Sequence, residues 1–134
     1  MRVSGNSRIG GLAGTLGAII LALSFCLAKQ NPAGADELPV IADSDAGAHV
    51  GQMAIVEGLV AEVYVSKKGD IFLNFEAPYP NEVFSGVIFA ASAAAFEDPG
   101  AYQGRQIRLS GSIRLYRGKP EIVLETPAQI RVMP

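Results

Sequence analysis

The chain has 134 residues, a length that accommodates one domain plus a terminal segment and excludes most multi-domain catalysts. It contains 18% charged residues, one cysteine, one histidine and no tryptophan, and its 11 basic residues stand against 13 acidic ones. Hydrophobic residues make up 49% of the chain, and a long block of them lies between Leu12 and Ala28. The remainder has the composition of an ordinary globular domain.

The first 35 residues have the organisation of an export signal. Arg2 and Arg8 precede the apolar block without an acidic residue, and the polar sequence 29–32 follows it. The small residues of the sequence 33–35 fit the positions that a signal peptidase reads. We therefore expect residues 1–35 to be a signal peptide that is cleaved after Ala35, and the mature protein to be periplasmic or secreted.

Two alternatives would keep the chain at a membrane through this N-terminus. Cys26 could carry a lipid, although the bulky Phe25 before it argues against that modification. The apolar block could also remain as an uncleaved anchor, although its length is at the short end of what a bilayer core requires. All three interpretations place the remainder of the chain outside the cytoplasm.

Cleavage after Ala35 changes both the chemistry and the charge of the chain. The single cysteine leaves with the signal, so the exported part has no disulfide and no thiol, and its core must suffice alone. The removed segment carries three basic residues and no acidic one, which leaves 8 basic against 13 acidic residues, a net charge of about −5. This charge argues against a strong general affinity for nucleic acid, which depends mainly on the neutralisation of phosphates.

The mature chain is predicted to consist of a linker and one domain. Residues 36–48 are small, acidic and contain proline, which is typical of a flexible lead-in, and the domain is expected to span residues 49–134. Turn residues recur in the domain at regular intervals, and strand-like runs lie between them. The turns are expected at residues 68–70, 77–81, 98–100 and 117–120.

The first three runs predict strands. The run 52–66 is too long for one flat strand, and Gly58 within it is the expected place of a bulge or sharp bend. Residues 71–75 alternate in polarity, which places Phe72 on the face opposite to the apolar side chains of that strand. Residues 83–89 form a third strand with weaker alternation.

The second half of the domain begins with an exception to this pattern. Residues 90–96 are rich in alanine and lack β-branched side chains, which predicts a short helix. Residues 105–116 then alternate as in a strand that is buried on one side only. The last strand is expected over residues 121–132, and Pro127 is expected to interrupt it near a sheet edge. The predicted buried face of the fourth strand comprises Ile107, Leu109, Gly111, Ile113 and Leu115.

Three strands, a short helix and two further strands, with a long bent first strand, form the element order of the OB-fold. A β-sandwich would need more strands, and an SH3-like barrel would not place a helix between its third and fourth strands. We therefore predict an all-β protein, a five-stranded OB-fold barrel with a short helix between strands 3 and 4. Phe96 is expected to close the bottom of this barrel.

Three motifs also carry a resemblance to a known family. They are Val56-Glu57-Gly58-x-Val60, the sequence 72–75 followed by Tyr79-Pro80, and the sequence 111–122, which contains Tyr116-x-Gly118-Lys119-Pro120. Over residues 51–130 the chain resembles the small OB-fold modules of exported bacterial proteins that are usually called nucleic-acid-binding OB domains. The resemblance implies a binding function without catalytic residues.

No combination of residues in the sequence predicts catalysis. A nucleophile with its base, a carboxylate pair in a cleft and a metal cluster are all missing, so we expect neither enzymatic activity nor a cofactor nor a metal. His49 has no cysteine companion and is expected to have a capping or surface role. The sequence 43–47 hints at a calcium loop, but Ala48 and Ala54 stand where that loop requires glycine and glutamate. We therefore interpret it as a solvated part of the linker.

The OB-fold itself indicates where a ligand would bind. OB barrels use the face of strands two and three and the loops that join strands one to two and four to five. Both loops are basic here, so we expect five basic residues to converge on that edge and to outweigh the acidic total locally. Aromatic side chains there would stack on bases, each contributing on the order of 1 to 3 kcal/mol. The predicted nucleic-acid-binding residues are Lys67, Lys68, Phe72, Asn74, Arg114, Tyr116, Arg117 and Lys119.

Two functions of different classes remain open from the sequence. The first is an exported module that binds single-stranded nucleic acid weakly, with salt sensitivity and little sequence preference. The second is a periplasmic OB-fold protein whose partner is a small molecule, a glycan or an envelope protein, which the net negative charge favours. For each predicted residue there is also a structural interpretation: Lys67 and Lys68 fit any exposed turn, and Phe72 and Tyr116 could shield the outer face of the barrel.

Overall fold

The computed structural model describes residues 37–134, of which Leu38–Pro134 form one compact unit. The predicted signal peptide of residues 1–35, with Cys26, lies outside the described residues. Within the described part of the chain, no helix is long and apolar enough to cross a membrane.

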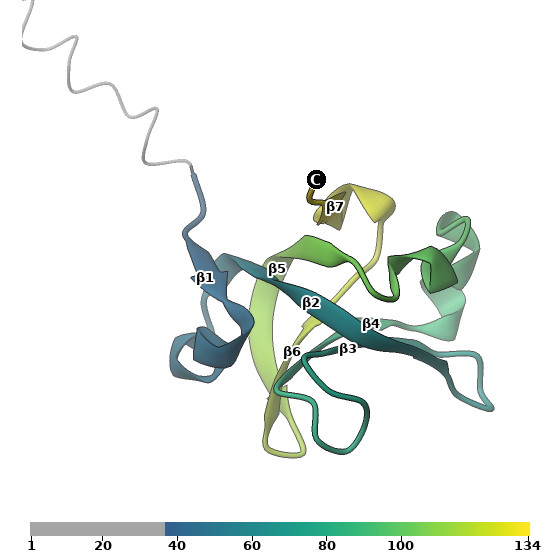
Figure 1. The fold of residues 1–134 in the computed structure, drawn as a ribbon, viewed down its shortest axis with the longest axis horizontal. Coiled ribbons are helices and arrows are strands. Elements are labelled where there is room, and N and C mark those ends of the chain that lie inside the picture. The colour runs from purple at the N-terminus through teal and green to yellow at the C-terminus, as the bar shows by residue number, and fades with distance from the viewer. Residues whose placement is uncertain (1–36) are drawn as a thin grey trace, which may run out of the picture. The chain divides into compact units, whose positions relative to one another are not determined.

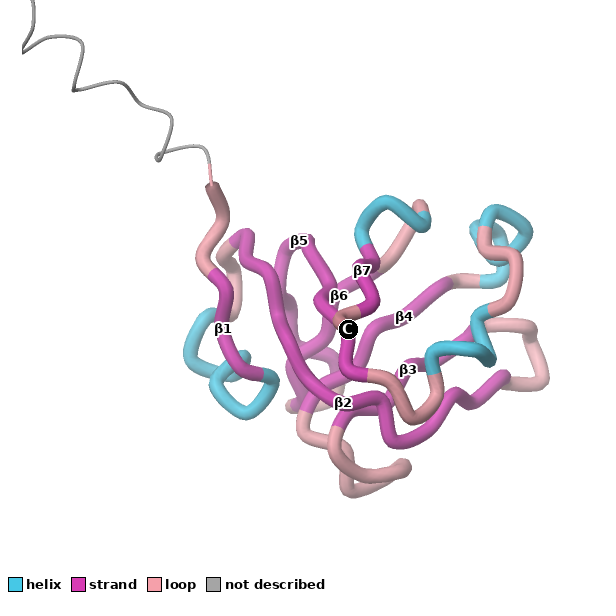
Figure 2. Tube along the Cα trace, turned by 45° about the horizontal axis from the view of Figure 1, so that its top comes forward, coloured by secondary structure: helices cyan, strands magenta, loops and turns pink. Residues whose placement is uncertain are grey.

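Seven β-strands make up the described domain, and short 3-10 helices connect them (Figure 1). The strands are β1 (Val40–Ala42), β2 (Met53–Val65), β3 (Ile71–Phe75), β4 (Phe84–Ile88), β5 (Gln106–Tyr116), β6 (Lys119–Val123) and β7 (Ile130–Val132). The 3-10 helices are η2 (Asp43–His49), η3 (Ala90–Ala95), η4 (Pro99–Tyr102) and η5 (Pro127–Gln129). Figure 2 shows these helical segments at the ends of the strands, around the sheet.

Five of the strands are joined in a closed circuit of pairings. β2 pairs with β3, β3 with β4, β5 with β6 and β2 with β5, all antiparallel, and β4 pairs with β6 in parallel. The helices η3 and η4 lie between the third and the fourth strand of this circuit. This connectivity agrees with the predicted OB-fold.

The strand count is seven, however, and the prediction of five was wrong. The two additional strands have three residues each and extend the sheet at its edges: β1 lies parallel to β2, and β7 lies antiparallel to β5. Sequence patterns miss such strands because three residues are too few to show an alternation.

The long strand β2 takes part in both halves of the sheet. Residues 53–59 pair with β5, and residues 60–65 pair with β3. The register shift lies between Val60 and Glu62, so the predicted bulge at Gly58 is misplaced. Gly58 is required for a different reason, because a Cβ atom there would collide with the Asp43 carboxylate and would lie 2.8 Å from Cδ2 of Phe75.

The predicted linker of residues 36–48 is mostly part of the folded domain. β1 pairs with residues 55–57 of β2, and η2 follows it immediately. Ala46 is completely buried in the core, and Asp43 is only 6% exposed. The acidic composition concealed this packing, although the apolar sequence 38–41 before it was a signal for a strand.

The remaining predictions fit the structure with smaller corrections. The alanine-rich segment is helical, but it forms the 3-10 helix η3, and Phe96 after it is buried in the core as expected. Pro127 interrupts the last predicted strand and begins η5, which separates β6 from β7. Leu115, predicted to be buried, is 54% exposed because β5 extends beyond the core into a hairpin with β6.

The core lies inside the circuit of strands and is formed by aliphatic and aromatic side chains. Phe75 and Phe84 face each other on neighbouring strands with their ring centroids 5.2 Å apart in an edge-to-face arrangement. The other large side chains that are fully buried in this core come from all five strands of the circuit and from the residue after β6: Val56, Val60, Leu73, Ile88, Ile107, Leu109, Ile113, Ile122 and Leu124.

Candidate functional site

The candidate binding surface is the outer face of the half of the sheet that contains β3, β4 and β6. Paired residues point to the same side of a sheet, so the register identifies the residues of this face. One row across it consists of Glu62, Asn74, Ser85, Glu121 and Arg114, taken from five strands. We call it the polar row. A neighbouring row begins with Tyr64, Phe72 and Val87. We call the exposed Tyr64 and Phe89 and the partly buried Phe72 together the aromatic surface.

Hydrogen bonds connect the first three members of the polar row. The side-chain amide of Asn74 donates to Oε1 of Glu62 at 2.9 Å, and its oxygen accepts a hydrogen bond from Ser85 Oγ at 3.0 Å. Asn74 is only 3% exposed. The structure therefore corrects the predicted role of Asn74: its polar atoms hold three strands together, and they are not presented to a ligand.

Arg114, at the other end of the polar row, has two partners. Its guanidinium Nη2 lies 2.6 Å from Oε2 of Glu121, a carboxylate that is almost completely buried. The guanidinium also lies over the ring of Phe89, 5.8 Å from its centroid. The charge of Arg114 thus balances Glu121, while its planar group remains half-exposed on the aromatic surface.

The aromatic surface offers flat apolar area to solvent. Tyr64 is 49% exposed, and its ring centroid lies 6.2 Å from that of Phe72 on the adjacent strand. Phe89 is 40% exposed and follows the end of β4. Val87 lies between these aromatic residues on the same face and is buried. The arrangement provides stacking positions on a rigid sheet.

Lys67 and Lys68 lie in the turn between β2 and β3, at one end of the aromatic surface. Both are exposed. The turn is fixed by hydrogen bonds between Ser66 and Asp70 and from the amide of Ala90 to the Asp70 carboxylate at 2.8 Å. This turn therefore presents two ammonium groups from an ordered backbone next to the start of η3.

Tyr116, Arg117 and Lys119 lie in the β5–β6 hairpin. The guanidinium of Arg117 lies 5.2 Å from the centroid of the Tyr116 ring, and both side chains are exposed. Lys119 is engaged by other residues: its ammonium donates to the carbonyl of Pro80 and lies 3.1 Å from Oε1 of Glu82. It thus fastens the hairpin to the β3–β4 connection.

The five basic residues do not converge on one edge as the sequence led us to expect. The β2–β3 turn precedes Ile71, whereas the hairpin contacts the connection after Phe75, so the two groups lie at opposite ends of β3 (Figure 1). Four residue steps along a strand separate these ends by about 13 Å. The structure brings Phe72 together with Tyr64 near Lys67 and Lys68, and it brings Tyr116 together with Arg117 at the far end.

Two contributors to this face were missed in the sequence. Phe89 was assigned to the third strand without a role, although two-residue spacing from Ser85 and Val87 places it on the outer face. The polar row was missed because no local pattern shows that Glu62 and Asn74 are neighbours.

His49, expected to have a capping or surface role, is half-buried at the end of η2, and its Nδ1 lies 3.1 Å from the side-chain oxygen of Gln52.

The chain was compared with families, with curated sequences and with solved structures. No family model and no curated protein sequence matches it. A protein from Leishmania major Friedlin that is assigned as an aspartyl-tRNA synthetase has a similar structure, with 9% identity and a TM-score of 0.50 over 72% of this chain and 21% of that one. An asparaginyl-tRNA synthetase from Entamoeba histolytica matches with 15% identity and a TM-score of 0.45, over 72% of this chain and 24% of the other.

These matches concern one small domain. The chain spans about a fifth to a quarter of the synthetases' length, and at this level of identity the likeness shows the fold alone. Together with the circuit of strands, the likeness to the Leishmania protein supports an all-β, OB-fold-like domain.

Proposed function

We propose that this protein is an OB-fold binding module for single-stranded nucleic acid, with little sequence preference. The observation that carries the proposal is the aromatic surface, on which the half-exposed Tyr64 and the partly buried Phe72 lie side by side, close to the turn that carries the exposed Lys67 and Lys68. Stacked bases need flat apolar groups, and the phosphates between them need nearby cations. The likeness to a domain within a protein assigned as an aspartyl-tRNA synthetase supports the same class of ligand.

The predicted residues take different parts in this proposal. Tyr64 and Phe72 stack on bases, and Lys67 and Lys68 contact phosphates at that end of the face. Tyr116 and Arg117 form a second contact point along the strand, about four residues away. Arg114 adds a planar group over Phe89, whereas Lys119 and Asn74 stabilise the surface without contacting the ligand.

We also propose that the protein acts by binding alone, without catalysis, and that it is exported by its N-terminal segment. The order of charged, apolar and small residues in positions 1–35 supports export. In that compartment the module would bind extracellular or periplasmic nucleic acid.

The proposal is tested with the full chain and labelled oligonucleotides, single- and double-stranded, by fluorescence anisotropy at low and near-physiological salt. We expect preferential binding of the single strand, because only unpaired bases can stack on Tyr64 and Phe72. The Phe72→Ala variant should weaken binding about tenfold, in line with the loss of one stacked base. The double variant Lys67→Ser with Lys68→Ser should weaken it mainly at low salt.

The matched control is Tyr79→Ala. Tyr79 is 70% exposed but lies in the β3–β4 connection, outside the aromatic surface. The Tyr79→Ala variant should bind the single-stranded oligonucleotide with the affinity of the unaltered chain. Equal losses in Tyr79→Ala and Phe72→Ala, or no single-strand binding at low salt, would overturn the proposed function and direct the search to protein, glycan or small-molecule partners.

A further inference from the structure

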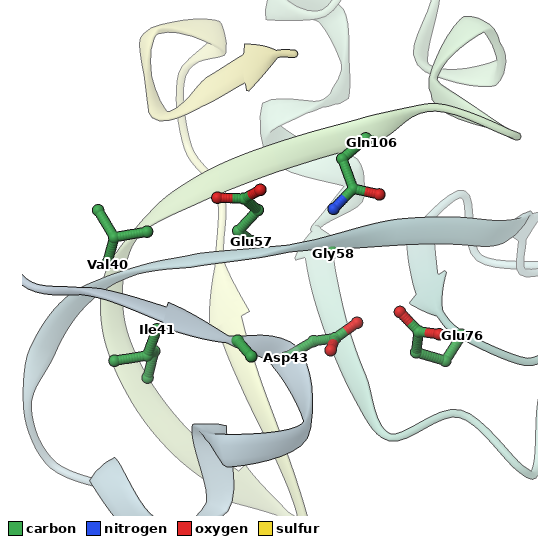
Figure 3. Close-up of a pocket in the computed structure, with 8 residues that line it drawn as sticks. Val40, Ile41, Asp43, Glu57, Gly58, Glu76 and Gln106 are labelled. Atoms are coloured by element: carbon green, nitrogen blue, oxygen red, sulfur yellow. The ribbon is translucent and has the colours of Figure 1, made fainter.

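A pocket of about 340 Å³ lies away from the aromatic surface, where β1 and the first residue of η2 lie beside β2 (Figure 3). Its wall combines the apolar side chains of β1 with three carboxylates. The lining residues are Val40, Ile41, Ala42, Asp43, Glu57, Gly58, Glu76 and Gln106.

The Asp43 carboxylate occupies this pocket because β2 has a glycine opposite to it. A Cβ atom at position 58 would collide with the carboxylate, so Gly58 makes room for it. Figure 3 shows the carboxylates of Asp43 and Glu76 pointing toward one another across the pocket. Glu76 directly follows β3 with a positive φ of 72°, which is uncommon for a residue with a side chain.

Among the described residues, one oxygen of the buried Asp43 carboxyl group lacks a hydrogen-bond partner, although the group also bonds to the backbone amide of Ser44 and to the Glu76 carboxyl. Asp43 is 6% exposed, and its Oδ2 atom is buried without a hydrogen-bond partner within residues 37–134. A buried acceptor without a partner is costly, and proteins usually supply one from a side chain, a water molecule or a ligand. The Oδ2 atom of Asp43 is therefore an acceptor with unused capacity for a hydrogen bond, in the wall of the pocket beside Gly58.

The charges around the pocket are not balanced by basic residues. On β2, Glu57 is paired with Arg108 of β5, with Nε and Oε1 3.0 Å apart. No Lys, Arg or His side chain lines the pocket, and neither Asp43 nor Glu76 has a salt-bridge partner in the described part of the chain. The only other polar side chain of the lining is the neutral Gln106. The negative charge of Asp43 and Glu76 is thus uncompensated.

The titration of Asp43 reflects this imbalance. Burial, a hydrogen bond with the Glu76 carboxyl and the like charge of Glu76 together raise the pKa of Asp43 from 3.8 to about 7. Near neutral pH the Asp43 carboxyl is therefore protonated in about half of the molecules, in a pocket whose lining has no cationic side chain.

We propose that this pocket binds the ammonium or guanidinium group of an organic cation, with the carboxylates of Asp43 and Glu76 as acceptors. Val40 and Ile41 provide apolar contact for the carbon chain that carries such a group. A metal ion fits less well, because no three His, Cys, Asp or Glu side chains come together as metal ligands within residues 37–134. The cation can belong to a free amine such as a polyamine or to a Lys or Arg side chain of another protein.

Binding of the cation must compete with protonation of Asp43. The ionised form of Asp43 is the one that accepts a cation, and with a pKa of about 7 its population falls from about nine-tenths at pH 8 to about one-tenth at pH 6. The affinity for the cation should therefore fall about tenfold between these pH values. A ligand that binds through apolar contact alone would show no such dependence.

The test uses the full chain and NMR titration with spermidine, n-butylamine and a short arginine-containing peptide. We expect saturable shifts of the Gly58 and Glu76 amide signals at pH 8 and weaker binding at pH 6. Tighter binding of spermidine or butylamine identifies a free amine as the source, and tighter binding of the peptide identifies a protein side chain. Asp43→Asn should weaken binding at pH 8 about tenfold or more and remove its pH dependence.

Asp45→Asn is the matched control, because Asp45 is an exposed acid in the same helix η2. It should leave binding and its pH dependence unchanged, and Glu76→Gln is a second variant in case Asp43→Asn disturbs the fold. The proposal is overturned if no saturable shift occurs at pH 8, if Asp45→Asn weakens binding as much as Asp43→Asn, or if Ca²⁺ or Mg²⁺ binds at these residues while the amines do not. Binding of nucleic acid is independent of this outcome, since the pocket and the aromatic surface share no residue.

Discussion

At the scale of single residues, Gly58 and Asp43 form a complementary pair. The absence of a side chain at position 58 lets the carboxylate of Asp43 lie against β2, and this contact attaches η2 to the sheet. A small residue at one position thus determines where a charged residue from a distant part of the sequence can be buried.

Gly58→Ala is expected to destabilise the domain by about 1 to 3 kcal/mol, because the new methyl group would displace the Asp43 carboxylate and press on the ring of Phe75. Unfolding in urea measures this change. Gly47→Ala is the control, since a Cβ atom at position 47 has no neighbour within 4 Å. Equal stability of the two variants would show that the close approach at Gly58 does not constrain the fold.

Asp43 is also expected to make the stability depend on pH. Its pKa is 3.8 in a peptide and about 7 in the folded domain, so the folded state binds more protons than the unfolded state between these values. The free energy of unfolding should therefore decrease as the pH rises from about 4 to about 7, by on the order of 3 kcal/mol. Asp43→Asn should flatten this part of the profile, and a slope that persists in that variant would assign the effect to other groups.

At the scale of elements, the β5–β6 hairpin combines a demanding backbone with an exposed basic side chain of the proposed interface. Its two turn residues, Arg117 and Gly118, have positive φ values of 52° and 82°. Such a two-residue turn favours asparagine or glycine at the first position, and arginine there is under mild strain. A residue that is unfavourable for the turn but stacked on Tyr116 is consistent with a role in binding.

Arg117→Asn should therefore separate stability from affinity. We expect the free energy of unfolding of the variant to be about 0.5 to 1 kcal/mol higher, because asparagine tolerates the left-handed backbone. We expect its affinity for single-stranded nucleic acid to be several-fold weaker. Thermal unfolding and anisotropy on the same preparation measure both effects. Stronger or unchanged binding in the stabilised variant would remove Arg117 from the interface.

Strands in which apolar and polar side chains alternate over five or more residues could be predicted from the sequence, whereas the three-residue strands and the helix η2 could not. β2, β3, β4 and β5 were located within a few residues because one face of each is apolar. β1 and η2 were missed because acidic side chains there are typical of linkers, and the burial of Asp43 depends on Gly58, a residue far along the chain. For the same reason the site was predicted in part: Phe72 is on the surface as expected, whereas Asn74 on the same face is buried by partners that only the register reveals.

At the scale of the whole molecule, the negative net charge limits what the aromatic surface can bind. In the proposed interface three exposed basic residues remain available to phosphates, Lys67, Lys68 and Arg117, since Arg114 and Lys119 are paired with carboxylates. The proposed complex therefore depends more on stacking than on charge, and it should be weak at physiological salt.

This balance predicts a shallow salt dependence. For about three phosphate contacts on a single strand, the plot of log K against log salt concentration should have a slope of about −2. The double variant Lys67→Ser with Lys68→Ser should reduce the slope to about −0.7, with most of the high-salt affinity retained. A slope near zero in the unaltered chain would show that phosphates are not contacted.

The circuit of strands also has a consequence for how the chain reaches its fold. Met53 pairs with Ser112, so β2 and β5 meet only after nearly the whole domain has been synthesised, and such distant pairings are typical of folding in milliseconds to seconds. Within the circuit of five strands, the parallel pairing of β4 with β6 is completed last in sequence order, because its final residue is Val123. A chain that ends before residue 119 leaves one edge of β4 without its neighbour, and prematurely terminated products should therefore aggregate through that edge.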